Sequence, residues 1–267
     1  MRLLNLLKYV ILGIIQGITE PLPISSSGHI FILKNAFKTN IINDLNFEII
    51  VNTGSLLAVL ILYRNELIEL IKDFFKYSFN KTNDSKQNFD YIIKVIVGVF
   101  PILICGLLLK DYIENKLTDI SIIGYGYLIT AILLFMNRNK KGTKSSKDLT
   151  IPECLKIGIT SIIALIPGIS RSGTSYVAGL NQKLERKEAL KYSFMMYIPI
   201  SFGTLILGVK DIFLLDKEII VLYLISFICS FIASYFSLKW FVNKVTTNNL
   251  KYFALYCALI GIIVILA

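Results

Sequence analysis

The sequence predicts an all-α membrane protein that crosses the bilayer several times. Of its 267 residues, 55% are hydrophobic and only 17% are charged, which is fewer charges than a soluble domain of this length carries. The mean hydropathy is +0.66, and apolar stretches long enough to cross a bilayer recur along the whole chain. Because no hydrophilic block is long enough to form a soluble domain, we expect one integral membrane domain over residues 1–267.

Six apolar segments have the length of a membrane-spanning helix, which needs roughly 17–25 residues. Polar or basic residues separate each of these segments from the next, so each one is expected to form a single transmembrane helix. The six segments are Phe47–Tyr63, Tyr91–Leu109, Ile120–Met136, Tyr192–Gly208, Ile219–Ser237 and Tyr252–Ala267.

Two further apolar regions, Leu3–Phe37 and Cys154–Leu180, are interrupted in the middle by proline. The first contains Glu20-Pro21-Leu22-Pro23 and the second contains Pro167-Gly168. Proline removes a backbone donor and breaks a helix, and the residue before it avoids the helical region. Each region is too short for two spans and too interrupted for one. We therefore predict two re-entrant hairpins, each made of two half-helices that meet at membrane depth.

The two hairpins also resemble each other. A shift of 145 positions places Gly13 on Gly158 and Ser25 on Ser170, and Gly54 and Gly203 occupy similar places in the following spans. This similarity predicts an inverted-topology repeat, in which each half is one re-entrant helical hairpin plus three transmembrane helices. The repeats cover residues of about 1–136 and 154–267, and the basic loop 137–153 joins them.

The net charge of +10 comes from Lys and Arg in short segments between apolar stretches. That pattern is typical of topology signals and of attraction to lipid headgroups, so the bilayer is the expected partner and nucleic acid is not. If loop 137–153 is cytoplasmic, the cytoplasmic loops, Arg64–Asp90 among them, hold 17 basic residues and the outer segments hold 8. This bias predicts that both termini lie outside. Association into a homodimer stays open.

The first hairpin carries a dense group of polar residues around its break. Gln16 and Glu20 are four positions apart and share one helix face. His29, the single histidine of the chain, lies in the first turn of the second half-helix. Serine is a preferred residue at a helix start, and three serines stand where this half-helix begins: Ser25, Ser26 and Ser27.

The second hairpin places Arg171 between Ser170 and Ser172, and Thr174 and Ser175 follow. A helix N-terminus has unpaired N–H groups and a partial positive charge, so two such ends can bind an anion. Arginine is suited to bidentate contact with phosphate. A charge at the bilayer centre costs at least about 2.5–3.5 kcal/mol, so an arginine and a glutamate there are candidates for function. The two hairpins therefore predict an intramembrane phosphate site.

Structural roles are alternatives for several of these residues. A membrane serine can simply bond the carbonyl one turn back, and His29 can satisfy a buried carbonyl. Glu20 and Arg171 can form an ion pair without a catalytic role. Glu48 and Asn52, which share a helix face, can line the site or bond one another.

At these residues the sequence resembles the bacterial undecaprenyl-diphosphate phosphatases linked to bacitracin resistance. One family signature is a Glu/Gln-x-x-x-Glu run that continues into a Ser-rich Gly-His stretch, here Gln16 to His29. The other is P-G-x-S-R-S-x-x-T, here Pro167 to Ser175. Two positions depart from the pattern: Gln16 stands where many members have a first glutamate, and Ser175 stands where the motif ends in threonine.

The resemblance implies dephosphorylation of undecaprenyl diphosphate to undecaprenyl phosphate in the bacterial plasma membrane. This reaction recycles the lipid carrier of peptidoglycan synthesis and confers bacitracin resistance. The implied catalytic residues are Glu20, Ser26, His29 and Arg171. The residues expected to bind the phosphates are Gln16, Ser25, Ser27, Ser170, Ser172, Thr174 and Ser175.

Details of the implied reaction stay open. A bare carboxylate repels a diphosphate, so we expect a proton or a divalent cation, Mg²⁺ or Ca²⁺, at Glu20. Ser26, His29 and water are all candidates for the nucleophile. Inverted repeats with broken helices are also typical of transporters, so the alternative is a secondary transporter or a polyprenyl-phosphate flippase.

Overall fold

The computed structural model describes residues 3–37, 45–117, 119–212, 217–244 and 250–266. Over these residues the chain is helical and forms no strand, as the sequence predicts. Eleven α-helices and two short 3₁₀ helices are described. They are α1 Leu3–Thr19, α2 Ser26–Phe37, α3 Leu45–Leu62, α4 Arg64–Asn80, α5 Asn83–Lys116, α6 Ile120–Asn137, η2 Ser146–Asp148, α7 Ile151–Ser161, η3 Ile162–Leu165, α8 Arg171–Asn181, α9 Arg186–Ile212, α10 Lys217–Lys244 and α11 Leu250–Leu266.

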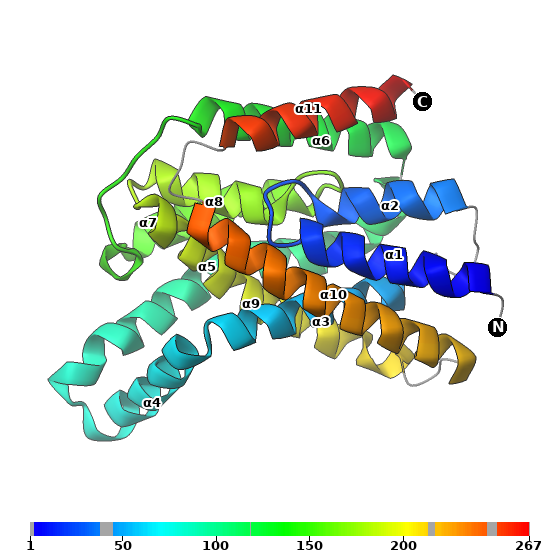
Figure 1. Cartoon of the computed structure of the whole chain (residues 1–267). Coiled ribbons are helices and arrows are strands. Elements are labelled where there is room, and N and C mark those ends of the chain that lie inside the picture. Colours follow the sequence, from blue (N-terminus) through cyan, green and yellow to red (C-terminus); the bar gives the residue numbers. More distant parts are fainter. Residues whose placement is uncertain (1–2, 38–44, 118, 213–216, 245–249, 267) are drawn as a thin grey trace.

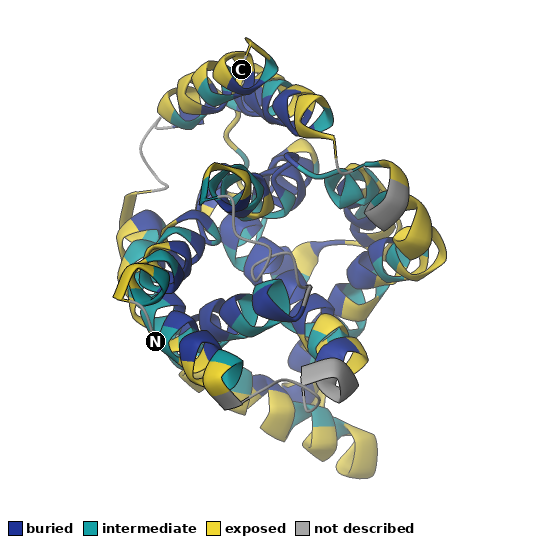
Figure 2. Cartoon of the chain, turned by 90° about the vertical axis from the view of Figure 1, so that its right-hand side faces the viewer, coloured by how far each residue is buried: buried dark blue, intermediate teal, exposed yellow. Residues whose placement is uncertain are grey.

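Most helices run side by side in one bundle (Figure 1), and exposed residues lie mainly on its outer rim when it is seen from one end (Figure 2). Within the described ranges, four helices are long and apolar enough to cross a membrane: Asn83–Ile113, Ile120–Asn137, Arg186–Gly208 and Glu218–Lys244. The bent pair α3–α4 makes a fifth candidate, and α11 is a shorter apolar helix. These helices confirm the polytopic membrane class.

Both predicted breaks occur where the prolines stand. Helix α1 ends at Thr19 and α2 begins at Ser26; α7 ends at Ser161 and α8 begins at Arg171. The chain reverses through left-handed backbone, with a φ of 64° at Ser25 and 89° at Gly168. A left-handed conformation is easy for glycine and costly for serine, so the side-chain bonds of Ser25 must offset some strain.

Helix α1 packs closely along α10, and α7 packs along α5. A Cβ on Gly13 would lie 2.9 Å from the Cα of Ser226, so the two helices approach closer than side chains allow. Serines of α10 bond the α1 backbone there: Ser226 Oγ donates to Tyr9 O at 2.9 Å and Ser234 Oγ to Gly17 O at 3.0 Å. Close approach of small residues with such bonds stabilises helix pairs in lipid and fixes the first hairpin.

The prediction that Arg64–Asp90 is a loop is wrong. The segment forms α4 and the first turns of α5, and α4 turns by 78° from the axis of α3. Its apolar residues recur at helical spacing, so Leu70 is buried and Phe74 stacks on Phe89 with ring centroids 5.3 Å apart.

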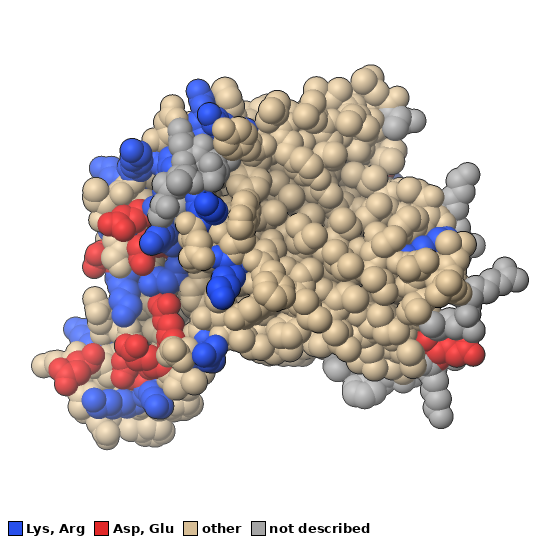
Figure 3. Space-filling model, viewed as in Figure 1, with Lys and Arg blue, Asp and Glu red and all other residues tan. Residues whose placement is uncertain are grey.

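Lys and Arg gather at one end of the molecule, with Asp and Glu among them, beside a broad surface that is free of charged side chains in this view (Figure 3). We call this the basic end; it comprises α4, residues 138–147 and the start of α9. The start of α1 and the end of α11 lie at the opposite end (Figure 1).

Candidate active site

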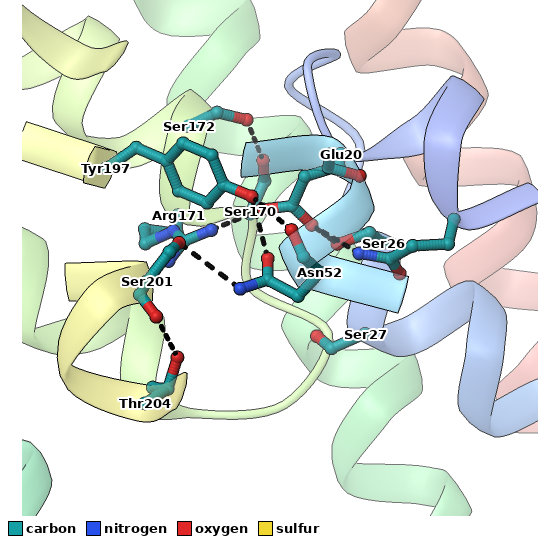
Figure 4. A network of polar contacts seen from close by, with 12 residues as sticks. Glu20, Ser26, Ser27, Asn52, Ser170, Arg171, Ser172, Tyr197, Ser201 and Thr204 are labelled. Atoms are coloured by element: carbon teal, nitrogen blue, oxygen red, sulfur yellow. Dashed lines mark hydrogen bonds and ion pairs between the residues drawn. The ribbon is translucent and has the colours of Figure 1, made fainter. Parts of the chain in front are cut away.

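The carboxylate of Glu20, which follows α1, is the centre of a polar network (Figure 4). It accepts a hydrogen bond from Gln16 Nε2 at 3.0 Å, one turn earlier on α1. The Ser26 hydroxyl at the start of α2 donates to the same oxygen, Oε2. The other oxygen is paired with the guanidinium of Arg171, the first residue of α8. The two proline breaks therefore bring four of the predicted residues together from both hairpins.

Arg171 also contacts an aromatic ring, which the sequence analysis did not predict. Its guanidinium carbon lies 4.4 Å from the ring centroid of Tyr197 on α9. The Tyr197 hydroxyl donates to Asn52 Oδ1 at 2.9 Å, and Asn52 Nδ2 donates to Ser201 Oγ at 3.2 Å (Figure 4). A cation above an aromatic face is attracted to it, so Tyr197 holds the arginine in place.

A sequence signal for this contact existed. Asn52 and Ser201 each lie two positions before the matched glycines Gly54 and Gly203. The repeat alignment therefore already paired the two polar residues that meet where α3 crosses α9.

Ser170 caps α8, as the sequence predicts. Its Oγ accepts from Gly173 N at 3.1 Å, and its own N–H donates to Thr130 Oγ1 at 3.0 Å. Ser25 Oγ accepts from Gly28 N at 3.4 Å at the start of α2. Both half-helices thus begin at a serine, with their N-termini directed to the region of Glu20.

The remaining hydroxyls have different surroundings. Ser172 Oγ donates to Leu22 O at 3.0 Å and so joins the second hairpin to the turn of the first. Ser27 is exposed, with its Oγ 3.4 Å from that of Ser25. Thr174 is buried and donates to Ser170 O at 2.8 Å. This bond to the carbonyl one turn back is the structural role that the sequence analysis considered for serines. Ser175 Oγ lies 2.5 Å from Ser193 Oγ and donates to Arg171 O at 2.9 Å.

His29 is directed away from Ser26. Its Nδ1 lies 2.7 Å from Ser25 O and 2.7 Å from the Tyr127 hydroxyl, and its Nε2 lies 2.7 Å from the Tyr256 hydroxyl. In the described part of the chain no hydrogen bond joins His29 to Ser26 or Glu20. The group that can accept the Ser26 proton in this arrangement is therefore Glu20.

A small cavity adjoins the network. Glu20, Arg171 and Tyr197 form one part of its wall, and apolar side chains such as Ile102 and Phe194 form another. Hydroxyls from four helices also line it: Ser55, Ser161, Ser172, Ser175 and Ser193. The hydroxyls of Ser161, Ser172 and Ser193 donate to backbone carbonyls in this structure, so Arg171 is the charged donor in the cavity wall.

Glu48 and Asn52 do not bond one another. Glu48 Oε1 is paired with Lys34 Nζ at 2.6 Å, and the Lys34 side chain is buried. Asn52 instead joins Tyr197 and Ser201, so of the two residues it is Asn52 that belongs to the site.

One carboxylate is available for a cation. Across the described residues no three His, Cys, Asp or Glu side chains form a metal-binding group. Mg²⁺ commonly binds one or two carboxylates together with substrate phosphates and waters. Glu20, whose oxygens bond Gln16, Ser26 and Arg171 in this structure, is the residue of the network that would hold such a cation.

Comparison with known proteins assigns the family. The family model "Bacitracin resistance protein BacA" matches residues 9–263. The chain is 42% identical over 264 residues to undecaprenyl-diphosphatase 2 of Bacillus thuringiensis (strain Al Hakam), covering 98% of this chain and 97% of the relative. It is 40% identical over 267 residues to undecaprenyl-diphosphatase of Oceanobacillus iheyensis, covering 98% and 96%. With the paired hairpin motifs meeting at Glu20, the chain belongs to the bacitracin resistance protein BacA family.

Proposed function

We propose that the chain is a membrane hydrolase that converts undecaprenyl diphosphate to undecaprenyl phosphate and inorganic phosphate. The observation that carries the proposal is the convergence of Gln16, Ser26 and Arg171 on the Glu20 carboxylate. The relatives named undecaprenyl-diphosphatase, which match nearly the whole chain, supply the substrate. The reaction returns the lipid carrier to peptidoglycan synthesis and confers bacitracin resistance in the bacterial plasma membrane.

The diphosphate would replace Glu20 as the partner of Arg171. A guanidinium can contact two phosphate oxygens at once, and Tyr197 holds its plane. The N-termini of α2 and α8 would supply further N–H donors. The polyprenyl tail would stay in lipid, because transferring it to water is unfavourable.

Ser26 would attack the terminal phosphorus. Its Oγ forms a bond to phosphorus, the bond from phosphorus to the bridging oxygen breaks, and undecaprenyl phosphate leaves. The serine proton passes to Glu20, which already accepts the Ser26 hydrogen bond. Arg171 would stabilise the charge that develops on the phosphoryl oxygens.

Water would then release phosphate from the serine. Its oxygen forms a bond to phosphorus as the bond to Ser26 Oγ breaks. Glu20 returns its proton to the serine, and the product is inorganic phosphate. A divalent cation held by Glu20 and the diphosphate would supply charge neutralisation when bound.

We also infer that the halves, residues of about 1–136 and 154–267, are inverted repeats. The packing supports this, because the contacts exchange between equivalent helices: α1 packs on α10 while α7 packs on α5. Helix α6 pairs with α11 and α3 with α9. One chain supplies every group in the proposed site, so the reaction needs no second copy.

The basic end would face the cytoplasm, because basic segments stay on that side of a bacterial membrane. Both termini would then lie outside, since the start of α1 and the end of α11 are at the opposite end.

Phosphate release from undecaprenyl diphosphate by the purified protein in detergent tests the function. We expect multiple turnovers without any membrane gradient, and loss of turnover in Arg171→Ala. Movement of the lipid across vesicle membranes without phosphate release would instead support the transporter alternative.

A further inference from the structure

Helix α4 carries a line of large apolar side chains with no protein partner. Ile68, Ile71, Phe75 and Phe79 are 49%, 55%, 54% and 80% exposed. Their spacing of three or four places them on one face of the helix. The neighbouring face packs on α5 through Leu70 and Phe74, so the exposed line is separate from the contact with the bundle.

The charges of α4 are sorted around this line. Each acidic side chain is bonded within the protein: Glu66 to Lys191 at 3.2 Å, and Glu69 and Asp73 to Asn88 at 3.1 and 2.6 Å. Lys72 and Lys76 are exposed, and neither forms an ion pair in the described part of the chain. Lys191 pairs with Glu66, whereas Glu69 and Asp73 keep their charge because the Asn88 amide is neutral. Helical spacing places Lys72 and Lys76 between these carboxylates and the apolar line, so the surface beside that line is basic.

The position of α4 matches this surface to a bilayer. The helix lies at the basic end, where the uncharged surface of the bundle stops (Figure 3). It also turns by 78° from α3, so it leaves the direction of α3 and projects away from the bundle (Figure 1). An amphipathic helix with lysines beside its apolar face lies in the interface between headgroups and acyl chains.

We propose that α4 binds the headgroup region of an anionic bilayer through Ile68, Ile71, Phe75 and Phe79, with Lys72 and Lys76 contacting lipid phosphates. Helix α4 links α3, which carries Asn52, to α5, which lines the cavity with Ile102. Binding to the interface would therefore hold two walls of the proposed active site at a fixed separation.

Tryptophan fluorescence in nanodiscs that hold one chain each tests this surface. Trp240, the single native tryptophan, is replaced by Phe, and Phe75→Trp reports on α4. A matched control, Gln87→Trp, lies on an exposed position of α5 at the same end. Lipids brominated near the headgroup should quench Trp at position 75 several-fold more than at position 87. Equal quenching at both positions would overturn the proposal.

Charge variants test whether Lys72 and Lys76 bind anionic lipid. An anionic surface favours each nearby lysine by about fivefold, so Lys72→Gln/Lys76→Gln should abolish the extra quenching that anionic lipid produces over neutral lipid. The control Lys86→Gln/Lys187→Gln removes the same charge from exposed positions at the same end. This control should retain the extra quenching by anionic lipid. Loss in both pairs, or in neither, would contradict the proposal. Loss of the quenching at position 75 when two chains share a nanodisc would overturn the proposal and assign the surface to a second copy.

Discussion

The Ser26 hydroxyl donates a hydrogen bond to Glu20, six positions earlier in the chain. A helix would not bring these two side chains together in this way, because residues six apart are almost two turns apart. The turn through Pro21 and Pro23 brings them together, and Arg171 from the other hairpin binds the second carboxylate oxygen. The residues that we propose as nucleophile, base and phosphate-binding cation therefore lie together at this carboxylate.

Arg171→Lys should be nearly as damaging as Arg171→Ala. The ammonium of lysine cannot bind two phosphate oxygens in the plane that Tyr197 holds. We expect turnover to fall by about 100-fold or more in both variants, measured as phosphate release. Turnover of Arg171→Lys within a few-fold of the native value would remove the bidentate contact from the account.

Tyr197→Leu should reduce turnover by about tenfold, because it removes the aromatic face beneath the guanidinium. Tyr197→Phe is the matched control: it keeps the ring and loses only the bond to Asn52. Its turnover should stay closer to the native value. Equal loss in the two variants would assign the effect to the hydroxyl instead of the ring.

Gly13→Ala should destabilise the protein by about 1–3 kcal/mol, because the added methyl group would overlap the backbone of Ser226. Gly106→Ala is the control, since the nearest atom to its Cβ is Leu165 Cδ2 at 3.5 Å. Thermal unfolding in detergent should show a lower Tm for the first variant alone. A native Tm for Gly13→Ala would contradict the close packing of α1 on α10.

Glu153 should make stability depend on pH in the acidic range. Burial opposes its charge, but the ion pair with Lys144 and the bonds from Thr150 lower the pKa of Glu153 to about 2. A lowered pKa stabilises the folded state above the ordinary pKa near 4.5, and this stabilisation is lost as the pH falls towards 2. Because the side chain of Glu153 is partly exposed and water screens its ion pair, we expect a contribution of about 1 kcal/mol.

Urea unfolding of the native protein and Glu153→Gln should show this difference at pH 6, and the two curves should converge as the medium is acidified. The exposed Asp148 provides the control, because Asp148→Asn should leave stability unchanged at pH 6 and in the acidified medium. A constant difference between Glu153→Gln and the native protein at all pH values would exclude the ionic contribution.

The hairpins could be predicted from the sequence because proline acts locally. Pro21, Pro23 and Pro167 interrupt apolar runs, and a broken helix in a membrane must be buried or line a cavity. The pairing of Glu20 with Arg171 was one of the alternatives in the sequence analysis, since both residues stand beside a break and a charge in the membrane needs a partner.

The partners of His29 could not be predicted. Tyr127 and Tyr256 lie 98 and 227 positions away on α6 and α11, and nothing local marks them. In the sequence His29 stands three positions after Ser26, whereas the packing of these helices turns the imidazole towards the tyrosines. Helix α4 was missed for another reason: its mixed apolar and charged residues resemble a polar loop unless their helical period is considered.

The central claim is that Ser26 is the nucleophile and Glu20 its base. Rapid quench with an undecaprenyl diphosphate labelled with ³²P on its terminal phosphate tests it most directly. The account predicts labelled protein that is stable to acid and labile to base, as phosphoserine is, and that is lost in Ser26→Ala while substrate still binds. Label that is labile to acid and stable to base would identify phosphohistidine at His29 and contradict the account.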